Sequence, residues 1–346
     1  MAKITIIGSG MMGSALAFPA RENGNEVTIV GTHLDREIIN ECIKTGKHPK
    51  LPYPFPSGIH FLQIEDLDIS LKDVDFVICG VSSFGVEWFR DEIIKRLPEN
   101  VPVISVTKGL FDTDEGELLT YTEIWNRKVK ELGKNNIFCG IGGPCTSYEL
   151  VYHDQTEVAF CGSDYSVLQM IKDCMKTDYY HISLTDDITG IESAVALKNS
   201  FALGIALTIG ENKKKFGDDS VLHFNSQAAV FGESVREMIK LLELQGCNNS
   251  DNLSVGLGDL YVTVYGGRTR QIGILLGEGY NIDEAREKLS GVTLESLVVS
   301  ERVARAVKIL AKKGKAKLSD FPLLMCIDRI LTEKQKAIIP WEDFTF

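Results

Sequence analysis

Short apolar runs alternate with longer amphipathic segments over the first half of the chain. Short apolar runs bounded by glycine or polar residues are typical of buried strands. Six such runs occur before residue 187: KITIIG, EVTIVG, FVICGV, VPVISVTKG, IFCGIGGP and TEVAFCG. Because helix-forming segments separate them, the pattern predicts an α/β domain over about 1–187, with a doubly wound parallel sheet of the Rossmann type.

From residue 188 onward the apolar positions follow a helical period, with breaks at glycine-rich and polar stretches. We therefore expect an all-helical second domain over about 188–346, with the active site in the cleft between the two domains. The segment AVALKNSFALGIALTIG is interrupted by Lys198 and Asn199, so we expect a buried helix too short for a membrane span. The proline-rich stretch at 48–59 is expected to be a constrained loop of the first domain.

The composition narrows the set of partners. The chain has 346 residues with 37 basic and 48 acidic side chains, a net charge of −11, which argues against nucleic acid or an anionic membrane as the main partner. Its eight cysteines include no CxxC pair and no secretory leader pattern precedes the first strand, so reduced thiols and a cytoplasmic location are expected. We expect no metal centre and no integral membrane segment, and the features are compatible with a homodimer.

The segment GSGMMGSAL directly follows the first predicted strand and opens a helix-forming stretch. In this context the three glycines indicate a dinucleotide-binding turn: the first permits a tight turn, the second a close approach to pyrophosphate, and the third close helix packing. A glycine-rich turn without a ligand is the alternative, which the strand-to-helix context disfavours. The predicted cofactor loop consists of Gly8, Ser9, Gly10, Met11, Met12 and Gly13.

The end of the second predicted strand bears on the choice of nucleotide. An acidic residue there would bind the 2′-hydroxyl of the adenosine ribose, but the chain has Gly31, Thr32 and His33 instead. Thr32, His33 and Arg36 could donate hydrogen bonds to the 2′-phosphate of NADP, or they could form an ordinary exposed loop. The missing acid slightly favours NADP over NAD as the bound nucleotide.

A lysine stands inside the apolar segment ESAVALKNSFALGIAL. Burying an ammonium without a partner is unfavourable, so Lys198 must either reach solvent along a wet stripe of the helix or serve the chemistry. Asn199 beside it and the apolar neighbours favour a functional role. A desolvated lysine is suited to proton transfer near neutral pH.

A second polar cluster lies in GLGDLYVTVYGGRTRQ at 256–271. Asp259 and Thr263 are four residues apart and would share one face of a helix. Arg268 follows a Gly-Gly break, where it could bind a phosphate or carboxylate, or form an ordinary surface salt bridge. The neighbouring polar residues favour the functional role.

Six motifs in the same order give the chain a resemblance to the NAD(P)-dependent sn-glycerol-3-phosphate dehydrogenases over nearly its whole length. They are GSGMMGSAL, HPKLPYPFPSGI, SVTKGL, GGPCTSYEL, ALKNSFALGIAL and GLGDLYVTVYGGRTR. They are similar, in turn, to the family's cofactor loop, Asn-x-x-Tyr-Leu-Pro loop, Thr-Lys-Gly segment, Gly-Pro-Ser/Thr-Phe-Ala-x-Glu segment, Lys-Asn helix, and Gly-Asp-Leu and Arg-Asn segment. The resemblance implies an oxidoreductase that interconverts sn-glycerol 3-phosphate and dihydroxyacetone phosphate by hydride transfer with NAD or NADP.

The resemblance also implies roles for individual residues. Lys198 would be the proton acceptor, and Lys108 and Asn199 would orient the reacting oxygen. Asp259 and Thr263 would complete the polar site. The implied substrate contacts are Lys108, Gly143, Cys145, Asp259, Gly267, Arg268 and Thr269. The implied cofactor contacts, beyond the cofactor loop, are Thr32, His33, Phe84, Lys108, Ser147, Arg268 and Glu295.

Two departures from the family pattern leave alternatives open. Thr269 stands where the family usually has Asn, and PCTSYE replaces Pro-Ser/Thr-Phe-Ala-x-Glu. The ligand is expected to be a small phosphorylated polyol or ketose, but a dehydrogenase of a different polyol phosphate or of a hydroxy acid is an alternative. A nucleotide-binding sensor without turnover is another, and a second site lysine beside the buried Lys198 argues against it.

Overall fold

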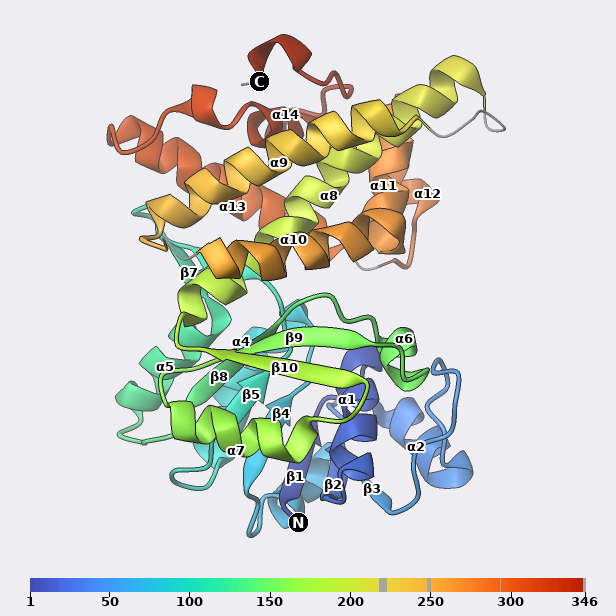
Figure 1. Cartoon of the computed structure of the whole chain (residues 1–346), viewed down its shortest axis with the longest axis vertical. Coiled ribbons are helices and arrows are strands. Elements are labelled where there is room, and N and C mark those ends of the chain that lie inside the picture. The colour runs from blue at the N-terminus through green and yellow to red at the C-terminus, as the bar shows by residue number, and fades with distance from the viewer. Residues whose placement is uncertain (218–222, 248–249, 293, 345–346) are drawn as a thin grey trace. The chain divides into compact units, whose positions relative to one another are not determined.

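A computed structural model describes residues 1–217, 223–247, 250–292 and 294–344 (Figure 1). Its contacts divide the chain into two compact units: unit 1 comprises Met1–Lys108 and Tyr121–Glu192, and unit 2 comprises Gly109–Thr120 and Ser193–Phe346. The segment Gly109–Thr120 lies in unit 2, so this division differs from the expected 1–187 and 188–346. The chain therefore passes from one unit to the other three times.

An eight-stranded sheet forms the centre of unit 1, in the order β10-β9-β8-β5-β4-β1-β2-β3. Its strands are β1 (Lys3–Ile7), β2 (Glu26–Val30), β3 (Ile59–Leu62), β4 (Phe76–Cys79), β5 (Val103–Ser105), β8 (Phe138–Gly142), β9 (Thr156–Cys161) and β10 (Tyr180–Thr185). The stretch β3-β2-β1-β4-β5-β8 has the 3-2-1-4-5-6 order of doubly wound dinucleotide-binding sheets. The predicted Rossmann-type sheet is therefore confirmed.

The sheet differs from the expected parallel one at a single pair of strands. β8 and β9 run antiparallel, with Gly140 opposite Cys161. The connection between them contains the five-residue helix α6 (Ser147–Val151), which is too short to serve as the crossover that a parallel pair needs. The sequence pattern also missed β3, a four-residue strand that pairs with β2 and is only half buried.

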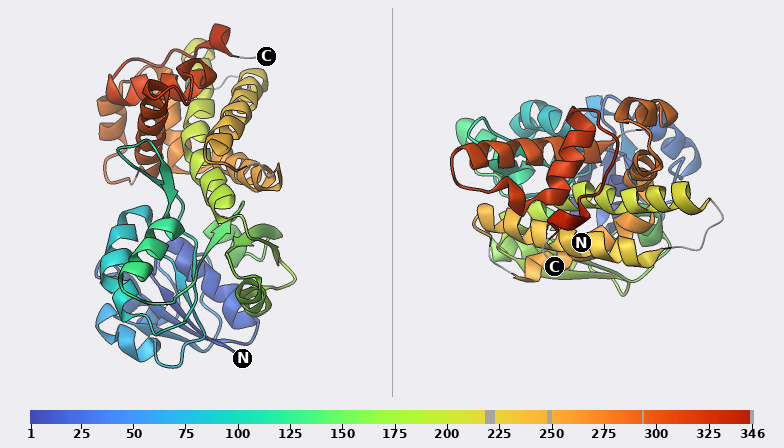
Figure 2. Two further views of the ribbon diagram at one scale, coloured as in Figure 1. Left: turned by 90° about the vertical axis from the view of Figure 1, so that its left-hand side faces the viewer. Right: turned by 90° about the horizontal axis from the view of Figure 1, so that it is seen from above.

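Helices cover both faces of this sheet (Figure 2). The helices of unit 1 are α1 (Met11–Glu22), α2 (Arg36–Thr45), α3 (Leu67–Ser70), α4 (Val86–Trp88), α5 (Tyr121–Glu131), α6 and α7 (Tyr165–Met175). On one face α1 contacts both α6 and α7, and on the other α5 packs on the helical turns of 89–96. The core between them includes Ile6, Ile29 and Ile78, all at most 1% exposed.

The described part of 193–346 consists of helices joined by turns, which confirms the predicted all-helical region. The helices are α8 (Ile188–Phe216), α9 (Phe224–Leu244), α10 (Ser250–Tyr265), α11 (Gly267–Glu278), α12 (Ile282–Lys288), α13 (Glu295–Lys312) and α14 (Pro322–Thr332). Unit 2 also holds an antiparallel hairpin of β6 (Leu110–Asp112) and β7 (Leu118–Thr120), which the sequence pattern missed.

The hairpin is attached to α13 by contacts along its length. Leu110 lies fully buried in the helical core, and its carbonyl oxygen accepts a hydrogen bond of 2.8 Å from Arg302. Asp112 forms an ion pair with Arg305, and the Lys313 ammonium donates to the Glu115 carbonyl at 2.9 Å. These contacts explain why Gly109–Thr120 belongs to unit 2 although the flanking sequence belongs to unit 1.

Helix α8 is longer than the sequence pattern predicted. It runs through Lys198 and Asn199 without a break for 29 residues, so the expected buried helix is present, but the expectation that it is too short for a membrane span was wrong. Among the described residues it is the one helix long and apolar enough to cross a bilayer, and 89% of its most apolar window is buried. Such burial is what a core helix shows. A Cβ on Gly273 of α11 would lie 2.5 Å from the Ala206 Cβ, so the two helices pack with their backbones close together.

Candidate functional site

The glycine loop lies at the ends of β1 and β4, where the strand order of the sheet reverses. Gly8 has a φ of +104°, and a Cβ on it would lie 2.9 Å from the carbonyl carbon of Gly80. A Cβ on Gly13 would lie 2.5 Å from the Gly8 carbonyl oxygen, whereas one on Gly10 would meet nothing closer than 3.8 Å. Packing thus requires glycine at positions 8 and 13, and the backbone at Gly10 is open to a ligand.

Helix α1 begins at Met11, and Gly10 at its N-cap has no side chain that could cap it. Its first amides therefore remain available to an anion, and the helix dipole favours negative charge there. The crevice at the carboxyl ends of β1 and β4 is where open α/β sheets bind nucleotides. The loop Gly8–Gly13 therefore fits the pyrophosphate of a dinucleotide.

A carboxylate does stand near the end of β2, contrary to the sequence analysis. The Oδ2 atom of Asp35 accepts hydrogen bonds from the Ser9 amide at 3.2 Å and from the Thr32 amide and hydroxyl, both at 2.9 Å. The sequence analysis missed Asp35 because it lies beyond the strand end. The available signal was an aspartate directly before helix α2, a position from which a side chain can turn back onto the preceding loop.

The groups expected to bind a 2′-phosphate are partly engaged within the protein. Both donors of Thr32 point to Asp35, and Arg36 forms an ion pair with Glu65. His33 is exposed, and its ring centroid lies 5.6 Å from that of Trp88. No acid stands at the strand end itself, as the sequence showed, but Asp35 lies near it, so the missing acid supports the choice of NADP less strongly.

Lys108 joins two of the sequence motifs within unit 1. Its ammonium donates a hydrogen bond of 3.1 Å to the Gly143 carbonyl oxygen, which connects the Thr-Lys-Gly segment to the Gly-Gly-Pro segment. Gly143 has a φ of +133°, and a Cβ there would lie 3.0 Å from the Glu157 carbonyl oxygen. Cys145 and Ser147 follow it and are half-buried, and Phe84 is 61% exposed.

The lysine that the sequence analysis singled out has a buried carboxylate as its partner. The Lys198 ammonium lies 2.5 Å from Oδ1 of Asp259, with the two side chains 12% and 1% exposed. Thr263, one turn further along α10, donates its hydroxyl hydrogen to the Asp259 carbonyl oxygen at 2.7 Å. Asn199 is half-buried beside Lys198.

Close packing of α8 against α10 creates this ion pair. A Cβ on Gly256 would lie 2.8 Å from the Ala194 Cβ, so a larger residue at position 256 would separate the helices. Ala194 is one turn before Lys198, and Gly256 is three residues before Asp259. The helices therefore approach closely about one turn away from the pair, and the pair offsets the desolvation of both charges.

A third polar group lies at the start of α11. Gly267 has a φ of +86° and follows Gly266, which has no side chain to cap the helix. Arg268 is 51% exposed and lies 3.6 Å from Glu295 at the start of α13, and Thr269 is buried. The first amides of α11 and the Arg268 guanidinium could together bind an anion.

The expected site residues thus occur in clusters within the units. Unit 1 holds Gly8, Ser9, Gly10, Met11, Met12, Gly13, Thr32, His33, Phe84, Lys108, Gly143, Cys145 and Ser147. Unit 2 holds Lys198, Asn199, Asp259, Thr263, Gly267, Arg268, Thr269 and Glu295.

Other candidate chemistry is absent from the described part of the chain. It contains no group of three or more His, Cys, Asp or Glu side chains that could hold a metal ion. All eight cysteines are free thiols, and burial raises the pKa of Cys79 and of Cys139 to about 12. Such thiols are poor nucleophiles near neutral pH.

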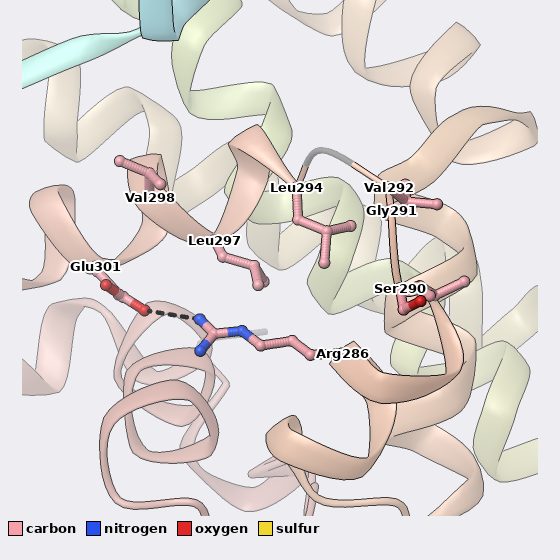
Figure 3. Close-up of a pocket in the computed structure, with 9 residues that line it drawn as sticks. Arg286, Ser290, Gly291, Val292, Leu294, Leu297, Val298 and Glu301 are labelled. Carbon is pink, nitrogen blue, oxygen red and sulfur yellow. Dashed lines mark ion pairs between the residues drawn. The ribbon is translucent and has the colours of Figure 1, made fainter.

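A cavity of about 330 Å³ in unit 2 lies between α12 and α13 (Figure 3). Five of its nine lining residues are leucine or valine, and its two charges, Arg286 and Glu301, face each other at 3.6 Å. The cavity contains none of the expected site residues, so we assign it no role in the chemistry.

Comparison with known proteins identifies the family. The model of the NAD-dependent glycerol-3-phosphate dehydrogenase N-terminus matches residues 3–167, and that of the C-terminus matches residues 187–339. An NADP(+)-dependent glycerol-3-phosphate dehydrogenase of Archaeoglobus fulgidus is 33% identical, over 96% of this chain and 96% of its own length. A glycerol-3-phosphate dehydrogenase [NAD(P)+] of Enterococcus faecalis is 28% identical, over 85% of this chain and 83% of its own length.

Solved structures agree on the fold. The crystal structure of glycerol-3-phosphate dehydrogenase from Coxiella burnetii superposes with a TM-score of 0.79 at 24% identity, over 97% of this chain and 96% of that one. The strand order of unit 1, the helical unit 2 and the two family matches all agree with the resemblance carried by the six motifs. The chain is a member of the NAD-dependent glycerol-3-phosphate dehydrogenase family.

Proposed function

We propose that the chain interconverts sn-glycerol 3-phosphate and dihydroxyacetone phosphate by hydride transfer with NAD or NADP. The observation that carries the proposal is the Lys198–Asp259 pair, in which the ammonium lies 2.5 Å from the carboxylate. The chain that holds this pair belongs to a family of dehydrogenases. A buried pair of this kind is expensive to maintain for stability alone, because well-packed apolar residues often serve equally well. A role in proton transfer accounts for its presence.

We assign the cofactor pyrophosphate to unit 1, and the proton-transfer lysine and the substrate phosphate to unit 2. The bound nicotinamide supplies the hydride for reduction and accepts it for oxidation. In the reducing direction Lys198 donates a proton to the oxygen on C2 of the ketone, and in the reverse direction it accepts that proton. Asp259 keeps the ammonium in place, while Lys108 and Asn199 orient the reacting oxygen.

The substrate phosphate is assigned to the start of α11. Arg268 is half exposed, and its distance of 3.6 Å to Glu295 leaves its donors able to turn toward an anion. The amides of 267–269 add the positive end of the helix, which favours a phosphate. Glu295 next to Arg268 is the residue we assign to the cofactor ribose.

NADPH is proposed to serve at least as well as NADH. Two facts support it: the archaeal relative carries the name of an NADP(+)-dependent enzyme, and Oδ2 of Asp35 already accepts three hydrogen bonds within the protein. A carboxylate held in this way is less available to a ribose 2′-hydroxyl.

The assay that tests the proposal follows nicotinamide absorbance with NADH and with NADPH. The substrates are dihydroxyacetone phosphate, a panel of other ketose phosphates, and unphosphorylated dihydroxyacetone. Highest kcat/KM for dihydroxyacetone phosphate supports the assignment. A higher value for another ketose phosphate would instead favour the alternative to which Cys145 and Thr269 point, a dehydrogenase of a different polyol phosphate. Cofactor binding without any turnover would favour a sensor.

We also propose a cytoplasmic location and a homodimer. All eight cysteines are free thiols, which supports a reducing compartment. Light scattering at several protein concentrations measures the oligomeric state, and a monomer at all of them would exclude the homodimer.

A further inference from the structure

The cofactor loop is held by two residues that the proposed reaction does not use. Ser9 is fully buried, and its amide donates to Oδ2 of Asp35 at 3.2 Å. Its carbonyl oxygen accepts from Nε2 of His48 at 3.1 Å and from the Ser14 hydroxyl at 3.2 Å. Both backbone polar groups of Ser9 are therefore fixed by side chains from other parts of unit 1.

The hydrogen bonds of His48 determine which of its nitrogens carries the hydrogen. The Lys50 amide donates to Nδ1 at 3.1 Å, so Nδ1 must be an acceptor. Nε2 therefore carries the hydrogen and donates it to the Ser9 carbonyl. The ring is 1% exposed, and burial is the main cause that lowers its pKa below the ordinary value of 6.5.

The geometry of the peptide unit links the Ser9 carbonyl to the ligand. In a trans peptide the carbonyl of one residue and the N–H of the next point in opposite directions. Holding the Ser9 carbonyl inward, toward His48 and Ser14, therefore turns the Gly10 N–H outward. Gly10 is exposed and its backbone is open to a ligand, as described above.

We propose that His48 and Asp35 are positioning residues for cofactor binding, which hold the Ser9 backbone from both sides so that the Gly10 N–H faces the cofactor pyrophosphate. The inference rests on the proposed function, because it takes Gly8–Gly13 as the cofactor loop. Asp35 fixes the amide side of Ser9 and ties it to Thr32 at the end of β2. His48 fixes the carbonyl side and brings the proline-rich loop into the cofactor site.

The groups that face His48 define its pH behaviour. Lys50 on the same loop disfavours the imidazolium, while Asp35 and the Ser9 carbonyl favour it. Protonation would put a hydrogen on Nδ1, which cannot then accept from the Lys50 amide. The new Nδ1 hydrogen would face the Lys50 N–H, so the ring must shift, which loosens the Nε2 hydrogen bond to the Ser9 carbonyl. The wild-type chain should therefore lose cofactor affinity as the pH falls below the lowered pKa of His48.

The test is direct titration of the purified full chain with NADPH and with NADH, followed by nicotinamide fluorescence. His48→Leu removes the donor at similar volume, and His48→Gln retains an amide donor that can reach Ser9. Losing one hydrogen bond of this kind should weaken cofactor binding about tenfold in His48→Leu, and less than about threefold in His48→Gln. The KM for dihydroxyacetone phosphate at saturating cofactor should stay within about twofold of wild type in both variants.

Two controls separate positioning from general damage. His60→Leu changes an exposed histidine on β3 of the same unit, and Asp66→Asn is the matched control for Asp35→Asn. Both controls should bind cofactor as wild type does, whereas Asp35→Asn should bind it more weakly. If His48→Leu fails to fold, the pH dependence of cofactor binding by His48→Gln tests the inference. The cofactor affinity of His48→Gln should stay constant over the low-pH range in which that of wild type falls.

The outcomes are distinct. Wild-type affinity in His48→Leu, equal losses in His60→Leu, or a low-pH loss that persists in His48→Gln would each overturn the inference while the proposed function stands. A wild-type chain that binds neither nucleotide would refute the proposed function itself.

Discussion

Replacing Lys198 with methionine separates the chemistry of the Lys198–Asp259 pair from its effect on stability. Methionine keeps most of the apolar stem and removes the charge. Breaking a buried ion pair on one side costs about 3–5 kcal/mol, and because Lys198 retains some solvent contact we expect the lower end, about 3 kcal/mol. Without the partner that Asp259 provides, removing a buried ammonium would instead leave stability unchanged or raise it.

A double variant tests whether the charge that remains on Asp259 causes this loss. Lys198→Met/Asp259→Asn removes both charges and should recover most of the loss. Lys334→Met breaks an exposed pair with Asp283, at 2.6 Å, and should cost less than about 1 kcal/mol.

Urea denaturation at pH 8 measures the unfolding free energies, and steady-state kinetics measures turnover. Turnover in Lys198→Met should fall by about 10²–10⁴, the usual contribution of general acid–base catalysis, with cofactor affinity preserved. A variant that keeps most of its turnover would refute the proton-transfer role. A variant as stable as wild type at pH 8 would refute the energetic argument, and so would a double variant less stable than the single one.

Three further outcomes follow from the structure. Arg268→Ala should lower kcat/KM for dihydroxyacetone phosphate about 10- to 100-fold while leaving unphosphorylated dihydroxyacetone unaffected, and equal losses for both would exclude a phosphate contact. Gly256→Ala should destabilise by about 1–3 kcal/mol through its clash with Ala194. Gly232→Ala on α9, whose Cβ would meet only the end of the Arg236 side chain at 3.8 Å, should instead gain up to about 1 kcal/mol; urea denaturation that shows a gain in both would refute the close α8–α10 packing. Burial raises the pKa of Glu237 to about 8, so the folded chain binds this proton more tightly than the unfolded chain does. The free energy of unfolding should therefore fall as the pH rises from about 5 to 8, and urea denaturation of Glu237→Gln should not show this fall.

Local sequence correctly predicted the features that a single segment of the chain forms. The strands that flank the glycine loop, the loop itself and the helical region all follow from periodicity and from glycine spacing, because each depends on residues close together in the chain. The same holds for Lys198, whose place in an apolar helix could be recognised without its partner.

Features that depend on distant pairing could not be predicted. Asp259 is 61 residues from Lys198, and His48 is 39 residues from the Ser9 carbonyl that it contacts. Asp35 was missed because the carboxylate reaches Ser9 and Thr32 from beyond the strand end, a matter of loop conformation rather than of residue order. The strand β9 was predicted, but its antiparallel direction was missed, because apolar composition does not reveal strand direction.

The hairpin of β6 and β7 has a consequence for how the chain is made. Arg302 and Arg305, which hold Leu110 and Asp112, lie 192 and 193 residues further along the chain. At about 5–20 residues per second, a ribosome synthesises α13 roughly 10–40 s after the hairpin. During that interval Leu110 has no helical core to enter, while the rest of unit 1, through Glu192, emerges on either side of it. Unit 1 can therefore fold during synthesis while Gly109–Thr120, which interrupts its sequence, is not part of it. Unit 2 can be completed only after α13 has been made.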